Sequence, residues 1–181
     1  MNIMFKLYFL LILSNIIKET VVSFIALSSG FQITIKIKGN GLQKIISDYF
    51  TRYSNNSNDN HYFPNEIILN GNLVKNLSNN IQIISEKEIN IINLKWETNT
   101  LCTSWLFQNC KNITEVDLSL CKGEGSIRYM FENCISLTSI YFGDFFKGVR
   151  CYWMEYIFSN CFSLLSLDLS NFDTSYITNM D

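Results

Sequence analysis

Residues 158–180 read FSNCFSLLSLDLSNFDTSYITNM, and this stretch decides the fold that we expect. Its opening, Phe-x-Asn-Cys, also occurs at 107–110 and 131–134, so that the three cysteines are 24 and 27 residues apart. An internal period of about 20 to 29 residues is typical of proteins built from stacked coils. The sequence therefore predicts three units of one structural repeat in the C-terminal half of the chain.

Four apolar positions recur at fixed distances from the cysteine of each unit. In the third unit they are Leu164, Leu167, Leu169 and Phe172. The L-x-x-L-x-L spacing predicts one short strand per unit, because every second residue of a strand faces the same side. We place these strands at 114–118, 138–142 and 165–169. One such coil cannot enclose its own apolar face, so we expect a β-rich leucine-rich-repeat solenoid of about three stacked coils.

The polar residues that alternate with these apolar positions are expected to face solvent. Together they form a predicted outward strand surface, and the candidate ligand-binding residues on it are Glu115, Asp117, Ser139, Tyr141, Ser166 and Asp168. The alternative stays open that these are solvent-facing strand positions without a ligand.

Residues 158–180 resemble, almost position by position, one repeat unit of the BspA-like surface proteins, in the Mycoplasma-type lipoprotein-associated form. The second unit departs from that pattern at 142–151, and the first departs after Ser119. The resemblance implies a secreted or cell-surface protein that takes part in adhesion. It does not extend to a bacterial lipid anchor, because the first cysteine is Cys102, far from the N-terminus.

The N-terminus has the pattern of a secretory signal peptide. One positive charge precedes an apolar run at 7–17, which is shorter than the roughly 20 residues that span a bilayer. We predict a signal peptide at 1–23 and hence a secreted or cell-surface location. The alternative is an uncleaved anchor, which would place Lys18 and Glu19 inside the membrane at roughly 3 kcal/mol each.

Residues 24–100 are expected to form a small β-rich cap in front of the repeats at 101–181, the last of which is incomplete. Three segments carry strand patterns: 33–38, 67–74 with its Asn70-Gly71 turn, and 89–96. These segments are similar to the leader that precedes such repeats in protist surface proteins. A cap is also expected on physical grounds, because the first coil would otherwise expose its apolar columns and a strand edge.

Export makes three Asn-x-Ser/Thr sites candidates for N-glycosylation: Asn55, Asn76 and Asn112. Asn55 and Asn76 lie in polar surroundings, and we favour them over Asn112, which lies inside the periodic region. Chance is the alternative explanation, because asparagine and serine are abundant in this chain.

Six cysteines in an exported chain are compatible with up to three disulfides. Three of them share one repeat position: Cys110, Cys134 and Cys161. Three stacked thiols cannot all pair with one another, so we expect a structural ladder of small buried side chains there. The disulfide candidates lie off this ladder: Cys102, Cys121 and Cys151.

Composition and motifs argue against nucleic-acid binding and against catalysis. The formal net charge is −2, whereas nucleic-acid-binding domains carry a basic patch. His61 is the only histidine, and neither a Cys-x-x-Cys pair nor a P-loop occurs, so we expect no metal, no cofactor and no enzymatic activity. Asp117 and Asp168 imitate the carboxylate pair of a glycoside hydrolase, but repetition already explains them. A secreted hydrolase is the least favoured alternative.

The favoured hypothesis is a recognition or adhesion module whose partner is an extracellular protein or glycan. The main alternative is a structural or antigenic coat component without a specific ligand. The chain stops at Asp181, part-way through a unit. We expect the chain to be a fragment of a longer repeat array; if it is complete, the open last repeat predicts self-association through its strand edge.

Overall fold

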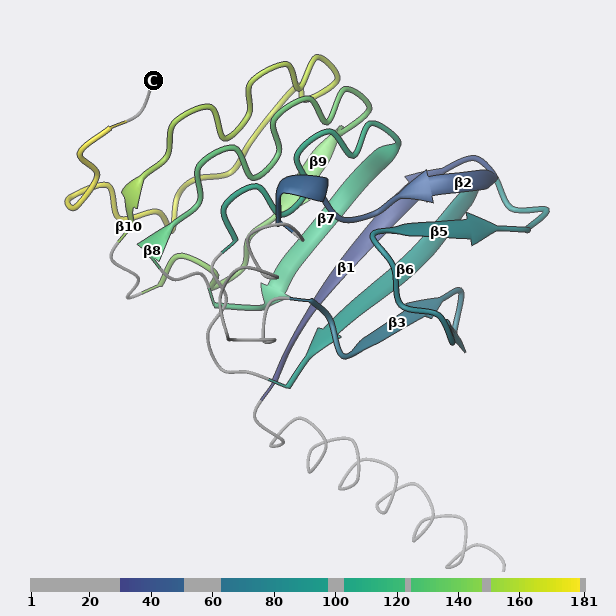
Figure 1. Cartoon of the computed structure of the whole chain (residues 1–181). Coiled ribbons are helices and arrows are strands. Elements are labelled where there is room, and N and C mark those ends of the chain that lie inside the picture. The colour runs from purple at the N-terminus through teal and green to yellow at the C-terminus, as the bar shows by residue number, and fades with distance from the viewer. Residues whose placement is uncertain (1–29, 51–62, 98–102, 123–124, 148–150, 180–181) are drawn as a thin grey trace, which may run out of the picture. The chain divides into compact units, whose positions relative to one another are not determined.

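The computed structural model describes residues 30–50, 63–97, 103–122, 125–147 and 151–179 (Figure 1). This part of the chain is β-rich, and its helical content is one turn at residues 48–50. Residues 31–181 form one compact unit, and the predicted boundary at residue 100 falls inside it. Several predictions lie outside the described residues: the signal peptide, Asn55, His61 and Cys102.

A six-stranded sheet runs through this unit in the order β4-β3-β6-β1-β7-β9. Its strands are β1 (Phe31–Lys38), β3 (Glu66–Leu69), β4 (Asn72–Leu73), β6 (Ile89–Trp96), β7 (Ile113–Leu120) and β9 (Ser139–Tyr141). β1 is antiparallel to both of its neighbours, and β9 is parallel to β7. Two small sheets accompany it: β2 (Gly41–Lys44) with β5 (Asn80–Ile83), and β8 (Gly125–Ser126) with β10 (Cys151–Trp153).

The strand that covers the first repeat is β1. Its apolar residues Ile33, Ile35 and Ile37 are fully buried, and the residues between them face outward, as the alternating pattern predicts. Thr34 of β1 lies opposite Asp117 of β7. β1 thereby closes one hydrogen-bonding edge of β7, which would otherwise be open to another chain.

Five of the six predicted strand segments are confirmed. The three in the leader correspond to β1, to β3 with β4, and to β6, and the first two in the repeats correspond to β7 and β9. Asn70 and Gly71 have φ angles of 50° and 87°, the positive values that the tightest hairpin turns require. The strands β2, β5, β8 and β10 were not predicted, because each is short and gives no long alternating pattern.

The predicted strand at 165–169 is wrong. No ladder joins these residues to β9, and the Leu165 side chain is 94% exposed. The segment has no strand partner, although Asp168 Oδ1 accepts the backbone N–H of Ser170 at 2.9 Å, as Asp117 does with Ser119 in β7. A strand needs a partner ladder, and β9 offers only three residues before the chain turns at Gly143.

The residues around each Phe-x-Asn-Cys motif repeat one backbone conformation. Six of them have φ angles between 55° and 62°: Trp105, Asn109, Tyr129, Asn133, Tyr156 and Asn160. The backbone N–H of Phe107 donates to Met130 at 2.9 Å, and that of Phe131 donates to Ile157 at 3.0 Å. The three segments therefore lie side by side in register.

Side chains of the motif form columns through these segments. The rings of Phe107, Phe131 and Phe158 are stacked, with centroids 5.8 and 5.9 Å apart. The side-chain amide of Asn133 donates to Asn109 at 2.9 Å, and Asn160 donates to Asn133 at 2.7 Å. Asparagine is one of the few residues other than glycine that readily adopt a positive φ, so this position both turns the chain and connects neighbouring segments.

The motif cysteines lie against the core, and two of their thiols form hydrogen bonds. Cys110 and Cys134 are fully buried, and the thiols of Cys134 and Cys161 each donate at 3.1 Å to the carbonyl of the motif phenylalanine one segment earlier. All three are free thiols, as are the disulfide candidates Cys121 and Cys151. The third disulfide candidate, Cys102, lies outside the described residues.

One hydrophobic core connects the leader and the repeats. It is formed by the inner face of the sheet, the stacked phenylalanines and the cluster of Phe142, Phe145 and Phe146. Among the described residues, no helix has the length and apolar character needed to cross a membrane.

Candidate functional site

The outer face of the six-stranded sheet carries most of the predicted ligand-binding residues. Eight of its outward side chains, from the leader and from the repeats alike, are Thr34, Lys36, Asn93, Lys95, Glu115, Asp117, Ser139 and Tyr141. The intervening residues of β1, β6 and β7 point into the core. We call this set of eight side chains the outer sheet face.

One row of polar groups crosses four strands of this face. Asn93, Thr34, Asp117 and Tyr141 are consecutive partners on β6, β1, β7 and β9. The Thr34 hydroxyl donates to Asn93 Oδ1 at 2.8 Å, and Tyr141 is 63% exposed. The row thus presents an amide, a hydroxyl, a carboxylate and a phenol to solvent. Together these groups can donate hydrogen bonds to a polar ligand and accept hydrogen bonds from it.

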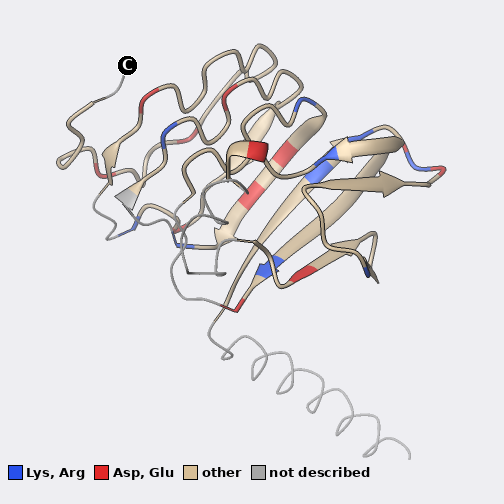
Figure 2. Cartoon of the chain, viewed as in Figure 1, with Lys and Arg blue, Asp and Glu red and all other residues tan. Residues whose placement is uncertain are grey.

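The adjacent row is held by an ion pair. Lys36 Nζ lies 2.7 Å from Glu115 Oε2, and the two side chains are 42% and 45% exposed. Ser139 lies opposite Glu115 on β9. Figure 2 shows acidic positions on β7 beside a basic position on β1. Glu115 is therefore compensated within the chain and offers less net charge to a ligand than the sequence suggested.

The recurring aspartates have a local role. Asp117 Oδ1 accepts the backbone N–H of Ser119 at 2.9 Å, and Asp168 makes the same contact with Ser170. Hydrogen bonds from the hydroxyl and the N–H of Ser170 lower the pKa of Asp168 below its usual value. Such turns explain why an aspartate recurs at this repeat position.

The structure brings four of the six predicted residues onto one face and leaves two outside it. Glu115, Asp117, Ser139 and Tyr141 lie on β7 and β9. Ser166 and Asp168 are exposed but belong to no strand. Sequence reasoning missed the contributions of Thr34, Lys36 and Asn93. Alternation showed that such residues face outward, but it did not show that β1 would lie next to β7.

Two of the glycosylation candidates fall within the described residues. Asn76 is exposed in the loop between β4 and β5. Asn112 is exposed directly before β7, and its side-chain amide donates to Gln43 Oε1 at 2.6 Å. The amide nitrogen that would carry a glycan is thus engaged at Asn112, and no hydrogen bond of the Asn76 side chain is present among the described residues.

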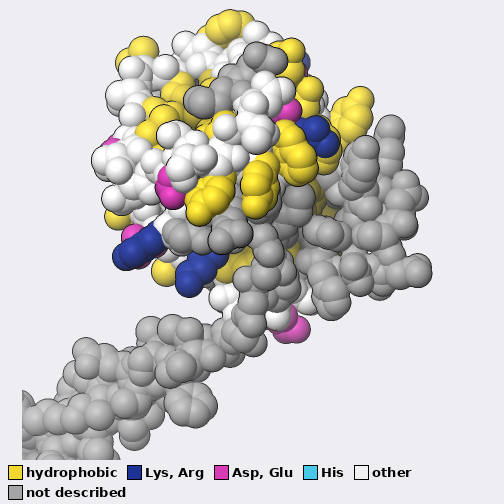
Figure 3. Space-filling view, turned by 90° about the vertical axis from the view of Figure 1, so that its left-hand side faces the viewer, with side chains coloured by type: hydrophobic (Ala, Val, Ile, Leu, Met, Phe, Trp, Pro, Cys, Tyr) yellow, Lys and Arg dark blue, Asp and Glu magenta, His cyan; other side chains and the backbone are white. Residues whose placement is uncertain are grey.

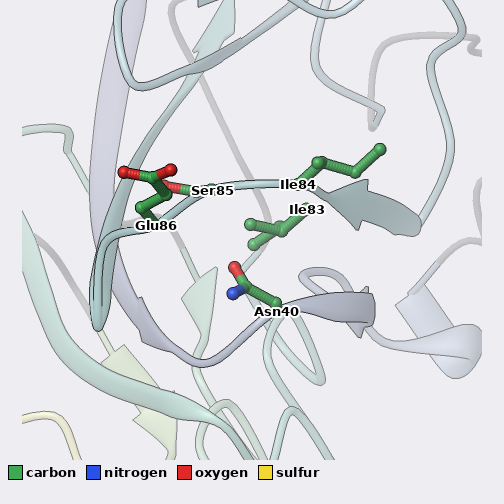
Figure 4. Close-up of a pocket in the computed structure, with 5 residues that line it drawn as sticks. All are labelled: Asn40, Ile83, Ile84, Ser85 and Glu86. Atoms are coloured by element: carbon green, nitrogen blue, oxygen red, sulfur yellow. The ribbon is translucent and has the colours of Figure 1, made fainter.

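A hollow of about 370 Å³ lies at the ends of β2 and β5, lined by Asn40, Ile83, Ile84, Ser85 and Glu86 (Figure 4). Ile83 is buried, whereas Ile84 is 89% exposed. The Ser85 hydroxyl accepts the backbone N–H of Lys87 at 3.1 Å. None of the five lining residues is a histidine or cysteine, so these residues supply no nucleophile with an adjacent imidazole base.

The described part of the chain contains no group of three His, Cys, Asp or Glu residues that could hold a metal ion. No protein-family model, curated protein or solved structure matches this chain. The functional argument therefore rests on the residues and their geometry.

Proposed function

We propose that this protein is a secreted or cell-surface recognition module that acts without catalysis. In this proposal the repeats form a BspA-like leucine-rich-repeat solenoid, and the outer sheet face binds an extracellular protein or glycan. The observation that carries the proposal is the polar row Asn93, Thr34, Asp117 and Tyr141, which continues from the leader into the repeats without interruption.

The stacked segments support the solenoid. The phenylalanine, asparagine and cysteine of each segment make ring contacts and hydrogen bonds with the same residues or their backbone in the next segment. Repeat proteins obtain their stability from such contacts between nearest neighbours. Such stacking produces an extended surface in which equivalent side chains stand about one strand spacing apart.

The shape of the surface supports recognition of a macromolecule. The outer sheet face spreads over several strands, whereas small-molecule sites are concave and largely apolar. Tyr141 is the most prominent aromatic side chain on this face, and tyrosine is a frequent source of binding energy in protein interfaces. Thr34 lies next to Asp117 in this row, and its hydrogen bond to Asn93 already holds both side chains in place.

Binding of the secreted chain to immobilised fibronectin, collagen and a glycan array tests the proposal. We expect at least one of these probes to bind, and Tyr141→Ala to weaken that binding at least tenfold. Tyr49→Ala is the matched control, because Tyr49 is 50% exposed but lies outside the six-stranded sheet. Absence of binding to every probe, or equal losses in the two variants, would overturn the proposal.

A structural role through self-association is the second candidate. Phe162 and Leu165 are 78% and 94% exposed, and large exposed apolar side chains favour association. Sedimentation of the wild type and of a Phe162→Ser, Leu165→Ser variant tests this candidate. Oligomers that are lost in the variant support it, and a wild type that is monomeric at all concentrations excludes it.

A further inference from the structure

Arg128 lies between two indole rings. Its guanidinium carbon is 5.1 Å from the ring centre of Trp105 and 6.0 Å from that of Trp153. Cations at these distances are attracted to the faces of aromatic rings. The two contacts hold a planar, permanently charged group in a defined orientation.

Repetition does not explain this arginine. Relative to the motif cysteine, the residues at its position in the first and third segments are Ser104 and Glu155. Stacking explains why the phenylalanine, asparagine and cysteine recur in each segment. Arg128 does not recur, so stacking of equivalent side chains does not explain it. Its side chain forms neither an ion pair nor a hydrogen bond with any described residue, and its Nε atom is buried without a partner.

Glu155 occupies the position equivalent to Arg128 in the third segment, but the two side chains form no ion pair. Glu155 Oε1 accepts the side-chain amide of Asn179 at 3.0 Å, and Glu155 Oε2 is buried without a partner among the described residues. A donor on Arg128 and an acceptor on Glu155 are thus both unsatisfied in neighbouring segments. No described carboxylate therefore neutralises this cation.

Exposed aromatic side chains lie on the third segment, which also supplies the Trp153 ring beside Arg128. Tyr152, Trp153 and Tyr156 are 38%, 46% and 47% exposed. Figure 3 faces the side of the molecule where β8 and β10 lie, and hydrophobic side chains emerge there in a row among polar ones. This side is separate from the outer sheet face, because β8 and β10 form a sheet of their own.

We propose that Arg128 and Trp153 bind an acidic sugar residue of an extracellular glycan. A carboxylate or sulfate on the sugar accepts hydrogen bonds from the Nη side of the guanidinium, whose fork geometry matches such anions. The exposed indole of Trp153 packs against the apolar face of the sugar ring. Arg128 supplies the charge selectivity and Trp153 supplies the contact area, so both are needed.

The test uses the full secreted chain and four defined probes: alginate and hyaluronate oligosaccharides with carboxylates, heparin with sulfates, and neutral mannan. We expect at least one acidic glycan to bind at least tenfold more tightly than mannan. Comparing carboxylated with sulfated probes identifies the anion. In the wild type, bound glycan should reduce the quenching of tryptophan fluorescence by acrylamide. This measurement detects contact between the glycan and Trp153 without any variant.

Variants then locate the binding surface. Arg128→Gln and Trp153→Ala should each weaken binding at least tenfold, while Arg128→Lys should lose part of it because an ammonium lacks the planar fork. Lys111→Gln is the control for general charge, since Lys111 is exposed and forms no ion pair with a described residue. Tyr49→Ala should leave binding of the acidic glycan unchanged, because Tyr49 is 50% exposed but belongs neither to the outer sheet face nor to the sheet of β8 and β10.

Three outcomes would overturn the proposal. The first is that none of the acidic glycans binds the wild type or protects its tryptophans. The second is that Lys111→Gln weakens binding as much as Arg128→Gln does. The third is that an acidic peptide such as polyglutamate binds equally well at the same residues, which would identify a protein partner instead.

Discussion

Lys36 and Glu115 form an ion pair of 2.7 Å between strands that are far apart in the sequence. Lys36 belongs to the leader, and Glu115 belongs to the first repeat. Their strands, β1 and β7, are direct neighbours in the sheet. The leader is thus part of the outer sheet face as well as a cover for the repeats, and several testable consequences depend on this arrangement.

Reversing the charge of Lys36 should destabilise the junction modestly. Lys36→Glu places two carboxylates opposite each other on neighbouring strands, and we expect a loss of about 0.5–1 kcal/mol in the free energy of unfolding. The swap Lys36→Glu with Glu115→Lys should restore most of it, as measured by urea denaturation. Lys111→Glu is the control outside the sheet, because Lys111 is exposed and forms no ion pair with a described residue. Failure of the swap to recover stability would argue against the pairing of β1 with β7.

Gly143 should not tolerate a side chain. Its φ is +53°, and an added Cβ would lie 2.9 Å from both the Cα and the Cβ of Ser119 on β7. We expect Gly143→Ala to cost roughly 2–4 kcal/mol from backbone strain and overpacking together. Gly71→Ala is the matched control, because Gly71 also has a positive φ but nothing lies within 4 Å of the added atom. Similar unfolding midpoints for the two variants would refute the close approach of Gly143 to β7.

Asn133 should contribute through both its backbone conformation and its amide. Asn133→Gly keeps the positive φ but removes two side-chain hydrogen bonds, so we expect a loss of about 1–3 kcal/mol. Asn133→Ala adds the cost of a left-handed conformation, about 1–2 kcal/mol more. Denaturant unfolding of both variants separates the two contributions. Equal stability of the glycine variant and the wild type would exclude the asparagine column.

The described cysteines should react slowly in the folded protein. Burial raises the pKa of Cys121 to about 12 and that of Cys161 to about 11, and it raises the pKa values of Cys110 and Cys134 further. The reactive species is the thiolate. We expect slow alkylation by iodoacetamide at pH 8 and rapid alkylation in guanidinium, resolved by site with peptide mass spectrometry. Fast labelling of Cys134 in the folded protein would contradict the buried column.

The same thiols should make the protein less stable at alkaline pH. Their unfolded pKa is about 9.0, and their folded values are raised. Above pH 9 the unfolded chain loses protons that the folded chain retains, so the free energy of unfolding falls as pH rises toward 11 and 12. Cys161→Ala should lose less stability than the wild type between pH 9 and pH 11. An identical decrease in both proteins would show that this thiol does not contribute.

Local patterns predicted much of the fold. Residues 33–38 alternate between apolar and polar, and the alternation places Ile35 in the core of β1. Asn70-Gly71 predicts a tight hairpin turn, which β3 and β4 form. The Phe-x-Asn-Cys spacing predicts equivalent positions in successive segments, and the rings of Phe107 and Phe131 are stacked. These features depend on a few neighbouring residues, which a single sequence contains.

The candidate site was predicted less completely. The periodicity identified Asp117 and Tyr141 as outward residues, and they are direct partners on β7 and β9. It also placed Asp168 in a third strand, where no strand ladder forms. Repeat spacing sets which residues are equivalent, but hydrogen bonding to the neighbouring strand decides whether a strand forms.

By itself, the sequence determined the alternating burial of β1, the tight turn at Asn70-Gly71 and which residues of the repeats are equivalent. Only the tertiary structure decided that β1 lies beside β7, that Thr34 joins the row of Asp117 and Tyr141, and that Arg128 lies between Trp105 and Trp153. The physical reason is the separation along the chain between the residues that interact. Alternation and turn preferences act within a few residues, whereas strand pairing and ring contacts join residues that only the packed core brings together.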